Sequence, residues 1–190
     1  MITDGAGTLI TTRSCLLNPN RNPAAGSEMI EQELARLGIR RVIWLEGDSG
    51  EPATSGHVDG YVLLMAPGHA LVQIIDDGGV EQPLPSWQDV ATLRCAIDAE
   101  GRTLTADCIR GPRTRYWKPR SKFAASCYLN AYIANGAVIT GRFGDSERDD
   151  TAKQTLARSF PGRKIVMLKI DHIANGGGGI HCLTQPMAMV

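Results

Sequence analysis

The stretch FPGRKIVMLKI at residues 160–170 joins the end of a helical pattern to a strand-forming run, and the same arrangement occurs three times in the chain. In each copy the helical pattern ends at a glycine, and a basic residue and a run of apolar and β-branched residues follow. Glycine commonly ends helices, and runs of this composition favour strands. The runs are RVIWL at 41–45, RTLTADCI at 102–109 and RKIVMLKI at 163–170.

Three amphipathic helices are predicted upstream of these runs. They follow Ser27, Ser86 and Asp150, whose side-chain oxygens can cap a helix, and they end before Gly38, Gly101 and Gly162. The apolar residues expected on their buried faces are Ile30, Leu34 and Leu37, then Val90, Leu93 and Ile97, and then Leu156 and Phe160. Other strand-like runs precede the helices: GTLITT at 7–12, YVLLM at 61–65 with ALVQII at 70–75, and YIANGAVIT at 132–140.

The predicted helices start at residues 28, 87 and 151, which are 59 and 64 residues apart. A nearly constant period of this length is typical of a repeated unit, here β-β-α-β. Such a unit buries its apolar faces against neighbouring units, and a ring of units around an axis is the natural closed arrangement. We therefore predict an α/β fold in which residues 1–190 form a single domain of three repeats, too few to close a ring.

Charge and hydropathy exclude several classes of partner. The 190-residue chain has 20 basic and 20 acidic residues, with no basic run interleaved with aromatic residues. This pattern does not favour nucleic acid or an anionic membrane as a partner. The longest apolar stretch, YVLLMA at 61–66, is too short to span a bilayer, and the N-terminus does not resemble a secretion signal. We expect a cytoplasmic protein.

A glycine run precedes one of the five cysteines, in GGGGIHCLTQ at residues 176–185. It lacks the Lys-Ser/Thr of a phosphate-binding loop. His181 and Cys182 point to opposite sides if the segment is extended, and the chain has no C-x-x-C pair, so neither a metal nor a disulfide framework is expected. We expect no cofactor. Of the functions considered for this segment, nucleophilic catalysis by Cys182 is the one that is left.

The loop ATSGHVDG at 53–60 supplies the partners expected for that thiol. His57 and Cys182 are 125 residues apart, close to the 123 residues between the first and third predicted helix starts. The two residues therefore occupy nearly equivalent positions in the repeats, and equivalent loops of a ring face one axis. Asp59 lies on the same side as His57 in an extended segment, whereas His181 is expected to point away from Cys182. The second repeat would bring Trp117 towards the same axis, where it could line a funnel or serve in packing.

Four segments together resemble the agmatine deiminases, a family shared with bacterial-type peptidylarginine deiminases of the pentein superfamily. They are CLLNPNRNP at 15–23, GHVDG at 56–60, YLNAYIANGAVI at 128–139 and GGGGIHCLTQ at 176–185, in the family's order. The resemblance covers essentially the whole chain. It implies the C-terminal part of a pentein-type α/β propeller, with about three of five β-β-α-β modules present.

The same resemblance implies hydrolysis of a guanidinium group. Cys182 would attack agmatine, with His57 carrying protons, and the thiouronium formed would be hydrolysed to N-carbamoylputrescine, a step in putrescine biosynthesis. Asp59 would bind the substrate cation, and Gly178 and Gly179 would let the backbone approach it closely. Asn130 matches the family pattern, but its spacing assigns it nothing beyond turn or backbone hydrogen bonding.

Two departures from the family pattern leave alternatives open. Family members have about two further modules, with acidic residues, before the segment matching ITDGAGTLITT at 2–12, and Ala53-Thr54-Ser55 stands where Glu-Thr-Asp is usual. Loss of such carboxylates weakens the hold on a cation. A protein-arginine or free-arginine deiminase, a non-catalytic guanidinium-binding module, and a partial chain that needs a complementing chain are the alternatives. Open ends of an incomplete ring predict a homo-oligomer or such a complementing chain.

Overall fold

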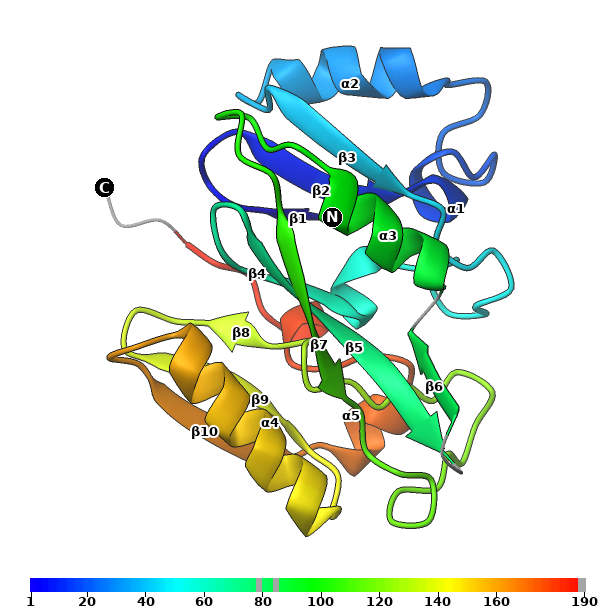
Figure 1. Cartoon of the computed structure of the whole chain (residues 1–190). Helices are drawn as coiled ribbons and strands as arrows, with labels where there is room; N and C mark the ends of the chain where they lie inside the picture. The colour runs from blue at the N-terminus through cyan, green and yellow to red at the C-terminus, as the bar shows by residue number, and fades with distance from the viewer. Residues whose placement is uncertain (78–79, 84–85, 188–190) are drawn as a thin grey trace.

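Three β-β-α-β units follow one another in the computed structural model, which describes residues 1–77, 80–83 and 86–187 (Figure 1). In each unit an antiparallel strand pair is followed by a helix, and the helix leads to a strand parallel to the second strand of the pair. The predicted β-β-α-β repeat is therefore confirmed. That these units are about three of the five modules of an incomplete pentein-type propeller stays a prediction.

The first unit contains the elements β1 (Ile2–Thr3), β2 (Thr8–Thr12), α2 (Ser27–Ala35) and β3 (Arg41–Leu45), with the short helix α1 (Arg13–Leu16) after β2. The turn between β1 and β2 is closed by Asp4, whose Oδ1 accepts the main-chain N–H groups of Ala6 and Thr8 at 2.8 and 2.9 Å. Every residue of β2 is buried, as expected for a strand covered on both faces.

The second unit is built around one long strand. Its elements are β4 (Val62–Ala66), β5 (His69–Asp77), β6 (Val80–Pro83), α3 (Trp87–Cys95) and β7 (Thr105–Arg110). Strand β5 pairs antiparallel with β4 and β6 and parallel with β7. The predicted helix cap is confirmed, because Ser86 Oγ accepts the main-chain N–H of Asp89 at 3.2 Å.

The third unit corrects one predicted boundary. It contains β8 (Tyr132–Ile133), β9 (Ala137–Arg142), α4 (Ser146–Ser159) and β10 (Lys164–Lys169), followed by α5 (Asp171–Asn175). Helix α4 begins at Ser146 instead of after Asp150, because the Asp145 side chain accepts the N–H of Arg148 and caps the helix. The three helices start at Ser27, Trp87 and Ser146, so the period is 60 and 59 residues, more regular than predicted.

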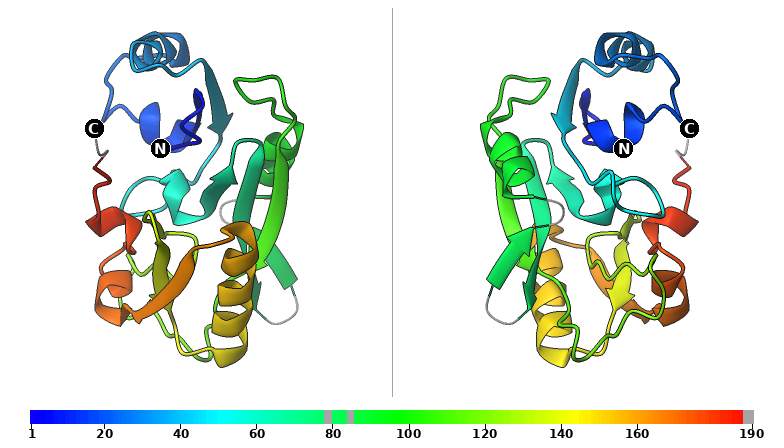
Figure 2. Two further views of the ribbon diagram at one scale, coloured as in Figure 1. Left: turned by 90° about the vertical axis from the view of Figure 1, so that its left-hand side faces the viewer. Right: turned by 90° about the vertical axis from the view of Figure 1, so that its right-hand side faces the viewer.

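The sheet of the second unit lies between two hydrophobic clusters. On β4 and β5, Val62 and Val72 pack into the cluster shared with the first unit, whereas their neighbours Leu63 and Leu71 pack into the cluster of the third unit. Successive strand residues face opposite sides of a sheet, so one strand can serve both clusters. Figure 2 shows the consequence, with the second unit packed between the first and the third.

The helices are shorter than their apolar patterns predict. Leu37 and Ile97 were expected on buried faces but are 79% and 47% exposed, because α2 ends at Ala35 and α3 at Cys95. Leu34, Leu93 and Leu156 occupy those faces as predicted and are all buried. Within the described ranges, none of the helices has the length and apolar character needed to cross a membrane.

Candidate active site

Three loops that are distant in sequence meet at one cluster of polar side chains. The loop between β3 and β4 carries His57 and Asp59, the segment before β8 carries Asn130, and the loop after α5 carries His181 and Cys182. Asp59 is central. Its Oδ1 lies 3.6 Å from His57 Nδ1, and its Oδ2 lies 3.2 Å from His181 Nδ1 and 3.8 Å from Cys182 Sγ. The structure thus brings together the three residues predicted to be catalytic.

Two of these loops form 3₁₀ turns at the cluster. The loop between β3 and β4 contains η1 (Val58–Gly60), and the loop after α5 contains η2 (His181–Leu183). The side chains of His57 and Asp59 approach each other across such a turn, where an extended segment was expected. In η2 the alternation of an extended strand does not apply, because a 3₁₀ helix has three residues per turn. The expectation that His181 points away from Cys182 is therefore wrong, since both side chains contact Asp59 Oδ2.

The electrostatics of the cluster favour an anionic Asp59 and a neutral His57. Burial alone would raise the pKa of Asp59, which is 6% exposed, but the hydrogen bond from His181 and nearby positive charge lower it to about 2. Burial lowers the pKa of His57 by disfavouring its cation, although the charge of Asp59 opposes this effect. At neutral pH, His57 is therefore able to accept a proton beside a fixed negative charge.

Asn130 lies between Asp59 and Cys182. Its Nδ2 donates to Asp59 Oδ2 at 2.9 Å and to the Asp59 main-chain oxygen at 3.0 Å, and it lies 3.4 Å from Cys182 Sγ. Sequence reasoning gave this residue no role in the site. The available signal is one amide within the apolar run CYLNAYI at 127–133, because a buried amide requires polar partners.

Glu51, which sequence reasoning also missed, holds the loop that carries His57. Its carboxylate accepts the main-chain N–H groups of Ala53 and Thr54, both at 2.7 Å, and the Thr54 hydroxyl at 2.5 Å. Thr54 Oγ1 accepts the main-chain N–H of His57 at 3.0 Å. Burial would raise the pKa of Glu51, but these hydrogen bonds lower it. Glu51 therefore acts as an ionised anchor for the loop.

The first unit holds the same loop from the other side. Three of its side chains donate hydrogen bonds to main-chain oxygens of the loop: Thr12 to Gly56 at 2.7 Å, Ser14 to Ser55 at 2.7 Å and Arg21 to Thr54 at 3.2 Å. Ser14 and Arg21 lie in or next to the segment CLLNPNRNP. That segment therefore supports the site without contributing a side chain to the cluster.

The glycine run packs against the site's own side chains. A Cβ atom on Gly178 would lie 3.3 Å from Cys182 Cβ and 3.4 Å from its Sγ. A Cβ atom on Gly179 would collide with Asn130, at 2.9 Å from both Cβ and Cγ. Contacts of real Cβ atoms are essentially never this short, so Gly179 is required by Asn130. The predicted close approach of these glycines to a substrate stays a prediction.

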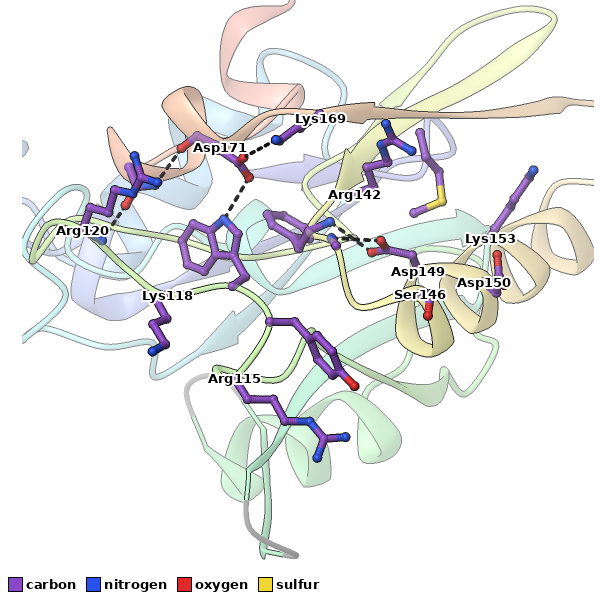
Figure 3. Close-up of a pocket in the computed structure, with 16 residues that line it drawn as sticks. Arg115, Lys118, Arg120, Arg142, Ser146, Asp149, Asp150, Lys153, Lys169 and Asp171 are labelled. Atoms are coloured by element: carbon purple, nitrogen blue, oxygen red, sulfur yellow. Dashed lines mark hydrogen bonds and ion pairs between the residues drawn. The ribbon is translucent and has the colours of Figure 1, made fainter.

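Trp117 lies outside the cluster. It is 8% exposed, packs edge-to-face on Phe143 with 5.6 Å between ring centroids, and donates from Nε1 to Asp171 Oδ1 at 3.2 Å. It lines a separate pocket of about 850 Å³, shown in Figure 3 with Asp171 and Lys169 on one wall. None of the cluster residues lines that pocket. The structure thus favours the packing role considered for Trp117 over a role in substrate binding.

The cluster offers a thiol, two imidazoles, a buried carboxylate and an amide. In the described part of the chain, no group of three or more His, Cys, Asp or Glu residues is arranged so that it could hold a metal ion. A thiol beside a fixed anion, which itself borders a neutral imidazole, is suited to attack on a cationic, electrophilic carbon. A guanidinium group has such a carbon and the N–H donors that a carboxylate accepts.

Known proteins share both the sequence and the fold. The sequence profile of the Porphyromonas-type peptidyl-arginine deiminase family matches residues 1–187. The agmatine deiminases of Medicago truncatula and Stutzerimonas stutzeri are 40% and 37% identical over 202 aligned residues, which cover 96% of this chain and 54% of each relative. The solved agmatine deiminase of Enterococcus faecalis superimposes with a TM-score of 0.83 at 32% identity, over 96% of this chain and 54% of that one.

The likeness covers almost all of this chain but only part of its relatives. The chain spans about half the length of the curated relatives it matches. Its mixed α/β sheets have the pentein fold of the agmatine and peptidyl-arginine deiminases, because solved structures of both kinds superimpose on it. With the match of the family profile to nearly every residue, these findings show that the chain belongs to the Porphyromonas-type peptidyl-arginine deiminase family.

Proposed function

We propose that this chain performs the chemistry of an agmatine deiminase, which converts agmatine and water into N-carbamoylputrescine and ammonia on the way to putrescine. One observation carries the proposal: Cys182 Sγ lies 3.8 Å from the buried carboxylate of Asp59, which also borders His57. A guanidinium bound to that carboxylate has its carbon next to the thiol. Such placement of two reacting groups can account for a large part of a catalytic barrier.

Asp59 would bind the substrate cation. Its low pKa keeps it ionised, and its burial strengthens its attraction for a planar guanidinium that replaces water. His181 occupies Oδ2 in the structure, so a bidentate substrate would share or displace that contact. A cation beside Cys182 also favours the thiolate over the thiol.

In the first half of the reaction, Cys182 would form a bond to the guanidinium carbon. His57, neutral at the start, takes up the proton released when the thiol ionises, and then donates it to the departing nitrogen. The C–N bond breaks, ammonia leaves, and a thiouronium joins the substrate to the sulfur. His57 is the group suited to this transfer, because burial lowers its pKa and it starts without the proton.

In the second half, water would replace the sulfur. His57 accepts one proton from the water as its oxygen bonds to the thiouronium carbon. The C–S bond then breaks to release the thiolate, and the remaining hydroxyl proton passes to solvent as the C=O bond forms. The product is a urea. N-carbamoylputrescine carries no charge on that group, so its attraction to Asp59 is weaker than that of agmatine and its release is favoured.

Two alternatives have specific support. The family name favours arginine in a peptide, or free arginine, as the substrate. These molecules share with agmatine the guanidinium group that the cluster would bind. A non-catalytic guanidinium-binding module is favoured by Ala53, Thr54 and Ser55, which offer no carboxylate to the cluster. A homo-oligomer or a complementing chain could supply such a group.

The decisive test measures ammonia release by the purified chain from agmatine, free arginine and an arginine-containing peptide, with Cys182→Ala as the control. Release from agmatine that the substitution abolishes is the expected result, and preference for either other substrate selects the first alternative. Binding of agmatine in calorimetry without ammonia release selects the binding module. Neither binding nor release by the folded chain, alone or as an oligomer, would overturn the proposal.

A further inference from the structure

The pocket that Trp117 lines is rich in positive charge (Figure 3). Six basic and three acidic side chains line its volume of about 850 Å³, whereas basic and acidic residues balance over the whole chain. The basic side chains come from four parts of the chain, which are the segment 113–122, β9, α4 and β10. They are Arg115, Lys118, Arg120, Arg142, Lys153 and Lys169. The proposed reaction at Cys182 gives this pocket no role.

Half of the residues in the segment RTRYWKPRSK at 113–122 are basic, and two are aromatic. The expectation that the chain has no basic run interleaved with aromatic residues is therefore wrong here. Such a run can bind a nucleic-acid strand when its rings are free to stack on bases. Trp117 is only 8% exposed, and the Tyr116 ring has the guanidinium groups of Arg113 and Arg115 at 5.1 and 4.8 Å from its centroid. Both rings are engaged by the protein, which favours a small anion as the ligand.

Two of the three acidic side chains in the pocket are engaged by the protein itself. Asp149 accepts a hydroxyl and two main-chain N–H groups at 2.8, 3.0 and 3.1 Å. Asp171 accepts Trp117 Nε1 at 3.2 Å and pairs with Lys169 at 3.4 Å. Four of the six cations, in contrast, form no ion pair within the described ranges: Lys118, Arg120, Arg142 and Lys153. Cations gathered in one cleft without counter-charges repel one another and attract anions from solution.

The segment 113–122, which forms one wall of the pocket, is anchored near both ends. Near its start, the Arg113 guanidinium donates to both carboxylate oxygens of the buried Asp145, at 2.5 and 2.7 Å. Near its end, Asn175 of α5 accepts the main-chain N–H of Arg120 and the Ser121 hydroxyl, both at 2.6 Å. A wall that is held in place before binding reduces the entropy lost when a ligand binds.

The size and composition of the pocket favour a ligand with several phosphate groups. Its volume of about 850 Å³ lies within the range of about 300–1,000 Å³ that is usual for small-molecule sites. Arginine binds phosphate oxygens through paired N–H donors, and lysine binds them as a point charge. A chain of phosphates can contact cations on more than one wall, which a single phosphate cannot. We propose that this pocket binds the polyphosphate chain of a small molecule, as in inorganic tripolyphosphate or a nucleoside triphosphate.

Isothermal titration calorimetry at pH 7.5, in low salt and without divalent cations, tests the proposal with tripolyphosphate, ATP and orthophosphate as probes. We expect tripolyphosphate and ATP to bind, and orthophosphate to bind about tenfold or more weakly, because it meets fewer cations. Arg142→Gln and Lys153→Gln each remove the charge of an exposed side chain that lines the pocket. Each should weaken the binding of tripolyphosphate about three- to tenfold. Circular dichroism of both variants checks that they are folded.

Arg158→Gln is the matched control, because Arg158 is an exposed residue of α4 outside the pocket and the chemical change is the same as in Arg142→Gln. Affinity for tripolyphosphate that is unchanged in both pocket variants, or that falls equally in Arg158→Gln, would overturn the proposal. The same holds if tripolyphosphate fails to bind up to about 1 mM, or binds no more tightly than orthophosphate. Tighter binding of a single-stranded oligonucleotide than of tripolyphosphate at the same salt would identify nucleic acid as the ligand instead.

Discussion

The two 3₁₀ loops that meet at Asp59 have the same local form and opposite surroundings. In η1, Val58 and Asp59 are 1% and 6% exposed, whereas η2 contains no buried residue. The first loop is held by hydrogen bonds that its main chain donates to the Glu51 carboxylate and by hydrogen bonds that it accepts from side chains of the first unit. The second is fixed by glycines that pack on Asn130 and Cys182. Burial strengthens the attraction of a carboxylate for a cation, whereas a nucleophilic thiol must be accessible to its substrate. The site therefore requires one buried loop and one exposed loop.

The largest effect is expected from filling the glycine space of the second loop. In Gly179→Ala the added Cβ has no room beside Asn130, so η2 must shift. A displacement of about 1 Å at a reacting group can cost about 100-fold in rate, and we expect a loss of that size in ammonia release. Alkylation of Cys182 should change as well. Gly136→Ala is the control, because a Cβ there meets nothing within 4 Å.

If Gly179→Ala keeps full activity, the second loop is loose enough to absorb a methyl group. The two loops would then differ in solvent exposure but not in how firmly they are held. A crystal structure of that variant would show whether Asn130 or the loop has moved.

The next effect concerns the buried anion of the first loop. The pKa of Asp59 is lowered in the folded chain to about 2 from 3.8, so its ionised form contributes about 2 kcal/mol of stability above pH 4. That contribution is lost as the pH falls from about 4 towards about 2, where the carboxylate becomes protonated in both the folded and the unfolded state. Asp59→Asn should lose this part of the pH dependence.

Urea unfolding of the chain and of Asp59→Asn at pH 6, 4 and 3 checks the prediction. The difference between their unfolding free energies should change in the acidic range and be constant from pH 4 to 6. Asp48→Asn, which changes an exposed carboxylate earlier in the same loop between β3 and β4, is the control. Parallel pH profiles for all three proteins would show that burial of Asp59 gives it no special electrostatic role.

The fold was predictable because each unit repeats local signals. Gly38, Gly101 and Gly162 mark the same point in all three copies, and the alternation of strand residues is strong. The start of α4 was misplaced because Asp145 and Asp150 are equally plausible caps in sequence, and only the contact with Arg148 distinguishes them. The choice between such caps depends on tertiary packing.

The site was predictable only in part. His57, Asp59 and Cys182 were found through their positions in the repeat and the family resemblance, and the structure brings them together. His181 was missed because its direction depends on 3₁₀ geometry that an extended reading of the sequence does not contain. Asn130 was missed because its partners in the site, Asp59 and Cys182, lie 71 and 52 residues away in sequence. Trp117 was misplaced for a related reason, since its segment has no regular structure from which its direction could be deduced.

The smallest effect is expected at Glu51, which supports the first loop from outside the cluster. Glu51→Gln keeps an acceptor but loses the charge that strengthens the bonds to Ala53 and Thr54, and we expect a loss of about 0.5–1 kcal/mol of stability. The charge of Glu51 also raises the pKa of His57, so its removal should lower that pKa further. The acidic limb of the activity profile should move to lower pH accordingly.

Titration of His57 by NMR, with urea unfolding, measures both consequences of Glu51→Gln. Glu33→Gln is the control, because it removes a similar charge from the exposed pair with Arg36 on α2. A His57 titration that shifts only in Glu51→Gln would show that the first loop acts on the histidine through charge as well as shape. If His57 titrates identically in both variants while stability falls only in Glu51→Gln, the Glu51 hydrogen bonds serve to hold the loop, and the electrostatic difference between the two loops resides in Asp59.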